Sequence, residues 1–289
     1  MEKFSSRFNA TKPIISCIMS CYSEIPEHLC MAIESILNQT YQNFEFLIAL
    51  DNPDNKELLK ILRVYEEKDK RIKVFVNPKN LGRSQSRNNL IKKAQGDYIA
   101  IMDADDIAYP DRFEVEVAVL EEGICDIVGS WIEEFDDNPE VIVSIRKVPE
   151  KHDDIVRFAK YRSPVNHPTL MFRKQIFDKI GGYANYDMGE DYHFVIRVIK
   201  NGYRLYNIQK VLCKFRRGEG FINRRRGLKI FSQEIRLYSE FYRMGFLNFY
   251  QLAINVAIRA VLRLSPRAFT SLLYRIIRKI YLFRKQKCT

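Results

Sequence analysis

Three aspartates, at positions 103, 105 and 106, follow directly after an apolar run that ends at Met102. Asp103 and Asp105 are alternate residues, so in an extended segment their side chains share a face. Carboxylate oxygens are ligands that Mg²⁺ and Mn²⁺ prefer. A cation held there would offset the charge of a diphosphate and make it a better leaving group. The alternative is a solvated acidic turn that caps a helix at Asp106 or Asp111.

Two other acidic positions stand at places where a site can form. Asp51 follows the apolar run 44–50, and Glu190-Asp191 follows Gly189 at the expected start of a helix. A positioned carboxylate can take a proton from an attacking hydroxyl, which makes Asp191 a candidate general base. Glu190 beside it would raise its proton affinity by like-charge repulsion. The alternative is a pair of acids favoured at a helix N-terminus by the macrodipole.

The elements that must position these residues alternate along the first 120 residues. Short apolar runs predict strands, and amphipathic or Pro-initiated segments predict helices between them. The expected strands are 14–20, 44–50, 72–76 and 98–102. The expected helices begin near residues 26, 83 and 110, and a further helix runs through Leu58, Leu62 and Tyr65. This order indicates an α/β fold with a doubly wound, mostly parallel sheet. Such sheets bind ligands at the carboxyl ends of their strands, where Asp51 and Asp103 fall.

The regular alternation of strands and helices ends after residue 126. Strands are expected at 127–135 and 141–146, a helix at 153–160, and a loop rich in breakers at 163–168, which includes His167. We expect this half to be a mixed sheet with loops that shape an acceptor site. No role is assigned to His167.

The positive charge is concentrated at the C-terminal end. The formal net charge is +11, yet residues 224–289 alone hold 15 Lys and Arg against 2 acidic residues. The remaining part is close to neutral, which argues against a nucleic-acid-binding core. From Pro266 on, apolar residues follow helical spacing with a basic opposite side, as in helices that lie on anionic membranes. A helix docked on the protein with a solvated basic face is the alternative. We therefore predict two parts, 1–220 and a basic amphipathic helical tail, 221–289.

The cysteines and the apolar segments of the sequence bear on the cellular compartment of the protein. The six cysteines form no Cys-x-x-Cys pair and sit mostly in apolar runs, so reduced core thiols are expected. The N-terminus lacks an apolar signal-peptide core, and no uncharged run is long enough to span a bilayer.

Several motifs, in order over residues 14–216, resemble family 2 glycosyltransferases, and are most similar to bacterial enzymes of the amylovoran and O-antigen type. They include Ile15-Ser16-Cys17-Ile18-Met19-Ser20-Cys21-Tyr22, Ser35-Ile36-Leu37-Asn38-Gln39-Thr40-Tyr41, Leu81-Gly82-Arg83-Ser84-Gln85-Ser86-Arg87-Asn88, Met102-Asp103-Ala104-Asp105-Asp106, Asn166-His167-Pro168, Gly181-Gly182-Tyr183 and Gly189-Glu190-Asp191-Tyr192.

The resemblance implies a GT-A fold, a UDP-sugar donor and an inverting single displacement with Mn²⁺ or Mg²⁺. It assigns Asp51, Arg87 and Asp103 to the nucleotide, Asp105 and Asp103 to the metal, and Asp191 to the general base. One departure is the sequence Asp51-Asn52-Pro53, where the family usually has Asp-Gly-Ser, so the neighbouring loop contacts differ.

We expect transfer of one hexose, glucose or galactose, to a polyprenyl-diphosphate-linked GlcNAc or GalNAc acceptor in O-antigen or capsule assembly. The enzyme would be peripheral, at the cytoplasmic face of a bacterial inner membrane, with residues 266–289 on the anionic surface. A nucleotidyltransferase acting on sugar phosphates, or a non-catalytic membrane-bound scaffold, are the alternative functions. A processive synthase is disfavoured because the single tryptophan, Trp131, is far from the place of a Gln-x-x-Arg-Trp motif.

Overall fold

The computed structural model describes residues 14–186, 188–218 and 227–264. The chain divides into two compact units, Met1–Glu219 and Gly220–Thr289. The assignment of residues 1–220 to the catalytic part and of residues 221–289 to a basic amphipathic tail stays a prediction. Residues 266–289, for which we expect membrane contact, lie outside the described residues.

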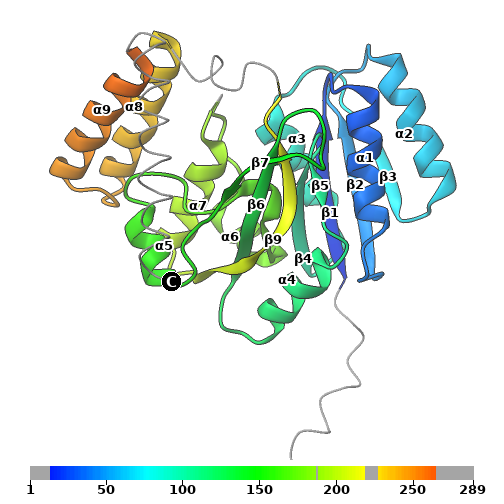
Figure 1. Cartoon of the computed structure of the whole chain (residues 1–289), viewed down its shortest axis with the longest axis horizontal. Helices are drawn as coiled ribbons and strands as arrows, with labels where there is room; N and C mark the ends of the chain where they lie inside the picture. Colours follow the sequence, from blue (N-terminus) through cyan, green and yellow to red (C-terminus); the bar gives the residue numbers. More distant parts are fainter. Residues whose placement is uncertain (1–13, 187, 219–226, 265–289) are drawn as a thin grey trace, which may run out of the picture. The chain divides into compact units, whose positions relative to one another are not determined.

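The first unit is built on one sheet, with the order β3-β2-β1-β4-β8-β6-β9-β5 (Figure 1). Its parallel half consists of β1 (Ile15–Cys21), β2 (Phe44–Leu50), β3 (Ile72–Val76) and β4 (Tyr98–Asp103). These strands match the four sequence predictions within one residue. All seven residues of β2 are buried, as both faces of a central parallel strand require.

The second half of the sheet is mixed, as predicted. Strand β8 (Met171–Arg173) runs antiparallel to β4 and to β6 (Ile127–Phe135). The long strand β9 (Leu205–Arg216) runs parallel to β6 and antiparallel to β5 (Ile107–Ala108). Strand β7 (Ile142–Arg146) pairs with β6 alone among the described strands.

Helices cover both faces of this sheet and bury two apolar clusters. On one face lie α1 (Pro26–Leu37), α2 (Lys56–Lys68) and α4 (Arg112–Glu121). On the other lie α3 (Arg83–Lys93), α5 (His152–Phe158), α6 (Lys174–Ile180) and α7 (Glu190–Lys200). Helices on both faces of a sheet whose first half is parallel are the doubly wound arrangement that the sequence predicts.

The second unit contains α8 (Leu228–Arg243) and α9 (Phe249–Leu264) in its described part. Glu234 of α8 receives two hydrogen bonds of 2.8 Å from the guanidinium of Arg263 of α9. Neither helix, nor any other in the part that the structure describes, is long and apolar enough to cross a membrane.

The cysteine prediction is confirmed for the described thiols. Cys17, Cys21, Cys30, Cys125 and Cys213 are all free, and all except Cys30 are buried.

Candidate active site

The carboxyl end of β4 carries Asp103, which lies in an ion-paired environment. Its Oδ1 accepts a 2.6 Å hydrogen bond from Nη2 of Arg87 and lies 3.9 Å from Nδ1 of His167. Burial opposes ionisation of this group, but Arg87 and His167 outweigh it and hold the pKa of Asp103 well below its usual range. Asp103 is therefore a permanently charged carboxylate whose charge is already matched.

Asp105, two residues on, has the opposite electrostatics. Burial, and then the charges of Asp103 and Glu24, raise its pKa to about 6. No Lys, Arg or His among the described residues comes within ion-pair distance of its carboxylate. Arg216 lowers the pKa of Asp105 only in part, so an added cation would further favour its ionised form.

Asp106 is not a helix cap, so that alternative is wrong for this residue. It is fully buried, and its Oδ1 accepts a 2.9 Å hydrogen bond from the backbone N–H of Arg216 in β9. The N-cap of α4 is Asp111, whose side chain makes no capping hydrogen bond. Burial, followed by the charges of Asp105 and Asp103, raises the pKa of Asp106 well above its usual value. Asp106 thus ties the acidic turn to the end of β9.

Arg87 connects the donor-side carboxylate to helix α7. It comes from α3, is 4% exposed, and also places Nη1 at 3.3 Å from Oε1 of Glu190. Burial lowers the pKa of Arg87, but Asp103 and Glu190 more than compensate and keep it above its usual value. The structure therefore brings Arg87, Asp103 and Glu190 together in one buried chain of charges.

Asp191 occupies the first turn of α7 beside Glu190. Gly189 precedes the helix with φ of +83°, a left-handed conformation that glycine adopts without strain. The charge of Asp191 acts on both Arg87 and Tyr183, so this carboxylate is within electrostatic range of that chain of charges. Arg87 neutralises the charge of Glu190. That Glu190 raises the proton affinity of Asp191 therefore stays a prediction.

Asp51 lies at the end of β2 and organises the loop after β3. Its Oδ1 accepts from Nδ2 of Asn77 and from the N–H of Leu81, at 2.7 and 2.9 Å, and its Oδ2 accepts from the N–H of Gly82 at 2.9 Å. A carboxylate oxygen can accept two hydrogen bonds, so Oδ2 retains acceptor capacity. Asp51 lines a pocket of about 390 Å³ together with Tyr22, Glu24, Gly82, Arg83 and Tyr186.

His167 and Glu24 belong to the site although sequence reasoning gave them no role. His167 is 8% exposed, and its Nε2 lies 3.2 Å from the hydroxyl of Tyr183. A histidine between prolines and breakers carried no periodic signal, so only its motif context could have pointed to it. Glu24 follows β1 and acts electrostatically on Asp105.

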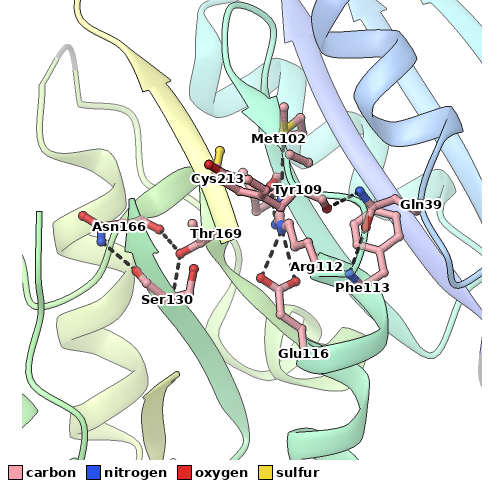
Figure 2. A network of polar contacts seen from close by, with 12 residues as sticks. Gln39, Met102, Tyr109, Arg112, Phe113, Glu116, Ser130, Asn166, Thr169 and Cys213 are labelled. Atoms are coloured by element: carbon pink, nitrogen blue, oxygen red, sulfur yellow. Dashed lines mark hydrogen bonds and ion pairs between the residues drawn. The ribbon is translucent and has the colours of Figure 1, made fainter. Parts of the chain in front are cut away.

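Two polar networks beneath the site hold its elements in place (Figure 2). The fully buried Arg112 donates to the carbonyl oxygen of Ile101 in β4 at 2.9 Å and to Glu116 at 3.0 Å. Around the turn that carries His167, the side chain of Asn166 donates to the carbonyl oxygen of Ser130 at 2.7 Å, and the backbone of Ser130 donates to Thr169 at 2.9 Å. Both networks lie outside the pocket and act by positioning.

Comparisons with known proteins agree with this arrangement. Residues 16–181 match the family described as Glycosyl transferase family 2. The chain belongs to that family. This family 2 glycosyltransferase is 36% identical to an uncharacterized glycosyltransferase of Methanocaldococcus jannaschii over 76% of this chain and 77% of that protein. Membership decides against the nucleotidyltransferase and the non-catalytic scaffold.

Two bacterial relatives span nearly the whole length. The UDP-Gal:alpha-D-GlcNAc-diphosphoundecaprenol beta-1,3-galactosyltransferase of Escherichia coli is 32% identical to this chain, and the match covers 92% of this chain and 98% of the relative. The amylovoran biosynthesis glycosyltransferase AmsE of Erwinia amylovora is 29% identical to this chain, and the match covers 92% of this chain and 100% of AmsE. The resemblance to bacterial enzymes of the amylovoran and O-antigen type is confirmed.

Solved structures establish the fold as GT-A-like. Staphylococcus aureus TarS in complex with UDP-GlcNAc superimposes with a TM-score of 0.63 at 17% identity, covering 86% of this chain and 72% of TarS. A mannosyltransferase from Pyrobaculum calidifontis, solved with GDP-Man and Mn²⁺, gives a TM-score of 0.63 at 15% identity, covering 93% of this chain and 80% of the other.

The acidic turn offers carboxylates that fit a metal bound together with a substrate. Within the described residues, no group of three or more His, Cys, Asp or Glu side chains is gathered closely enough to hold an ion by itself. Mg²⁺ is usually bound by one or two carboxylates together with substrate phosphates, so a complete protein cage is not required. Asp105, whose pKa is raised and whose carboxylate forms no ion pair with a described residue, fits such a role, with Asp103 two residues before it.

Proposed function

We propose that this glycosyltransferase moves a single hexose, glucose or galactose, from a UDP-sugar to a polyprenyl-diphosphate-linked GlcNAc or GalNAc. The reaction would build a repeat unit of an O-antigen, lipopolysaccharide or exopolysaccharide capsule. The observation that carries the proposal is the chain of ion pairs Asp103–Arg87–Glu190, which links the carboxyl end of β4 to the first turn of α7, where Asp191 lies. A separate pocket of about 390 Å³ at the ends of β1 and β2 supports it. The E. coli relative, which uses UDP-Gal and a diphosphoundecaprenol acceptor, supports the donor and acceptor classes.

The donor is assigned to the pocket at the ends of β1 and β2. Oδ2 of Asp51 has capacity to accept a hydrogen bond from a base N–H, and Arg83 at the pocket wall is positively charged. Arg87 is assigned to the nucleotide side indirectly, because both of its contacts hold protein carboxylates. When bound, Mn²⁺ or Mg²⁺ on Asp105, with Asp103, would neutralise charge on the diphosphate.

The chemical step is an inverting displacement. The acceptor hydroxyl oxygen forms a bond to the anomeric carbon as the bond from that carbon to the UDP oxygen breaks, and UDP leaves with the electron pair. Asp191 takes the hydroxyl proton as the attack proceeds. Arg87 holds Glu190, and so fixes the start of α7 that carries this base.

The acceptor lipid places the reaction at a membrane. We assign the enzyme to the cytoplasmic face of a bacterial inner membrane as a peripheral protein, with residues 266–289 on the anionic surface. Residues 265–289 carry seven Lys and Arg and no acidic residue. Each basic residue near an anionic leaflet contributes about 1 kcal/mol of attraction.

The direct test uses purified enzyme, a panel of UDP-sugars and undecaprenyl-diphosphate GlcNAc or GalNAc, with product mass as the readout. A product heavier than the acceptor by one hexose is expected. Asp191→Asn should lower kcat about a hundredfold to ten-thousandfold while leaving UDP affinity unchanged, because a general base acts in the transition state. Asp178→Asn, an exposed aspartate on α6, is the matched control. Appreciable turnover by Asp191→Asn would reject that base.

The metal assignment has its own test. Asp105→Ala should abolish the dependence of turnover on added Mn²⁺ or Mg²⁺, and chelation should stop the wild-type reaction. Turnover that is indifferent to a chelator would contradict a metal at Asp105.

A further inference from the structure

The β6–β7 hairpin carries an exposed apolar face that the proposed chemistry does not use. Val143 and Ile145 of β7 are 37% and 46% exposed, and Val141, just before the strand, is 60% exposed. Val143 and Ile145 are alternate residues, so they lie on one face of the strand. Strand β7 has no second neighbour among the described strands, and large exposed apolar side chains clustered on an edge strand mark an interaction surface.

The polar residues next to this face are those found where protein meets lipid headgroups. Lys147 lies two residues beyond Ile145, and its Nζ is 3.9 Å from the ring centroid of Trp131, the only tryptophan of the chain. Tryptophan is enriched at membrane–water interfaces, and lysine there keeps its charged end in water while its stem covers apolar surface. Of the three acidic residues at the hairpin end, Asp136 and Glu140 pair with Arg217 and Lys214. Glu133, which stands opposite Ile145 in the β6–β7 pairing, accepts a hydrogen bond from the hydroxyl of Tyr109.

The hairpin is attached to the acidic turn of the active site. Arg216, the last residue of β9, donates from Nε to the carbonyl oxygen of Asp105 at 3.1 Å and from Nη1 to the carbonyl oxygen of Asp137 at 3.0 Å. Its ring contact is with Phe135 at the end of β6, 4.5 Å from the centroid. The backbone of Asp105 and the end of the hairpin are therefore two contacts of one guanidinium.

We infer that the face formed by Val141, Val143 and Ile145 binds the polyprenyl chain of the acceptor where it leaves the bilayer surface beside the site. This inference rests on the proposed lipid-linked acceptor. The occupant is a hydrocarbon chain because the face is apolar, because Trp131 and Lys147 border it, and because the end of its hairpin shares Arg216 with the turn assigned to the diphosphate. The hairpin would then recognise the lipid, while the sugar is recognised in the site.

The test compares two acceptors that share GlcNAc diphosphate and differ in their tails. One carries undecaprenol and the other a hexyl chain. The variant Val141→Thr/Val143→Thr/Ile145→Thr keeps β-branched side chains, which suit a strand, and removes apolar surface. We expect the KM for the undecaprenyl acceptor to rise about tenfold or more, with the hexyl acceptor and the UDP-sugar unaffected. The control Val64→Thr/Ile124→Thr removes side chains of similar exposure, 40% and 44%, elsewhere on the same unit and should change neither KM.

Three results would overturn the inference. Equal KM changes with both acceptors would mean damage to the site, and no change with either would mean that the lipid lies elsewhere. A wild-type dimer in sedimentation that the triple variant dissociates would assign the face to a second copy of the chain. The hexyl acceptor separates the two proposals, because wild-type transfer to it supports the proposed function whatever the effect of tail length.

Discussion

Replacing Arg87 with methionine tests the charge chain that joins α3, β4 and α7. The change keeps a long side chain of good helix propensity and removes the guanidinium 2.6 Å from Asp103 and 3.3 Å from Glu190. The side chain of Glu190 is only 7% exposed, so it would lose its partner without gaining water. Asp103, at 25%, is partly solvated and keeps His167 nearby.

The magnitude follows from these exposures. Removing one partner of a buried ion pair costs about 3–5 kcal/mol, because an uncompensated charge remains. We expect the lower end, about 3 kcal/mol, since water reaches Asp103 and Arg83 lies 3.9 Å from Glu190. For a protein of this size the melting temperature should then fall by roughly 6–12 °C.

Urea unfolding at pH 7 and pH 4.5 measures the effect and its sign. Arg87 depresses the pKa of Asp103, so its stabilisation is present above the unfolded value of 3.8 and is lost as the pH falls below it. In the variant Asp103, no longer paired with Arg87, takes up its proton at higher pH, so the deficit should shrink from pH 7 to pH 4.5. Adding Glu190→Gln to Arg87→Met should recover part of the loss, because it removes one unpaired charge.

The matched control is Arg83→Met, since Arg83 is 65% exposed and its contact with Glu190 is long. It should cost less than about 1 kcal/mol. A loss below about 1 kcal/mol for Arg87→Met at pH 7, or a deficit that grows toward acid, would refute a buried charge chain.

Two further predictions concern buried polar groups that do not line the pocket. Arg112→Met should destabilise the protein by about 3–5 kcal/mol, because it leaves the fully buried Glu116 without its partner. Arg112→Met/Glu116→Met should cost much less, because apolar replacement of both residues leaves no unpaired charge. Unfolding in guanidinium chloride measures both variants, and a double variant as unstable as the single one would contradict this reasoning. Burial, and then Arg197, lowers the pKa of His193 from 6.5 to about 4, so the unfolded state binds more protons between these values and stability should fall as the pH drops from 6.5 to 4. His193→Gln should flatten that part of the stability curve, and an unchanged slope in urea titrations would argue against it.

The donor half of the molecule was predictable because its physics is local. Strands buried on both faces read as short apolar runs, and their carboxyl ends meet at one edge of a parallel sheet. Asp51 and Asp103 were therefore assigned to the same edge, where the structure places both. The extent of β2, residues 44–50, was predicted to the residue.

The acceptor half was harder because tertiary context outweighs its local pattern. Strand β9 is the longest described strand, yet its exposure does not alternate regularly, and its pairing with β6 shifts register at Trp131. A strand that changes register shows no clean period of two, so β9 was not predicted, whereas β6, residues 127–135, was predicted to the residue. The partners of Arg87 were equally hidden, because Glu190 lies 103 residues away in sequence. The resemblance supplied Arg87 as a pocket residue, and the contacts add that it joins two carboxylates.

The hydrogen bond from Arg216 to Asp106 has a consequence for the order in which the protein matures during synthesis. The two residues are 110 positions apart, so the acidic turn gains this contact only after the ribosome has made the last strand of the first unit. Strands β1 to β4 can pair with one another earlier, since all four have been synthesised by residue 103. Because long-range pairings form late and domains tend to fold as units, a nascent chain released before residue 216 should hold a partial sheet with an unanchored acidic turn. Premature termination would then yield fragments that cannot complete the donor site.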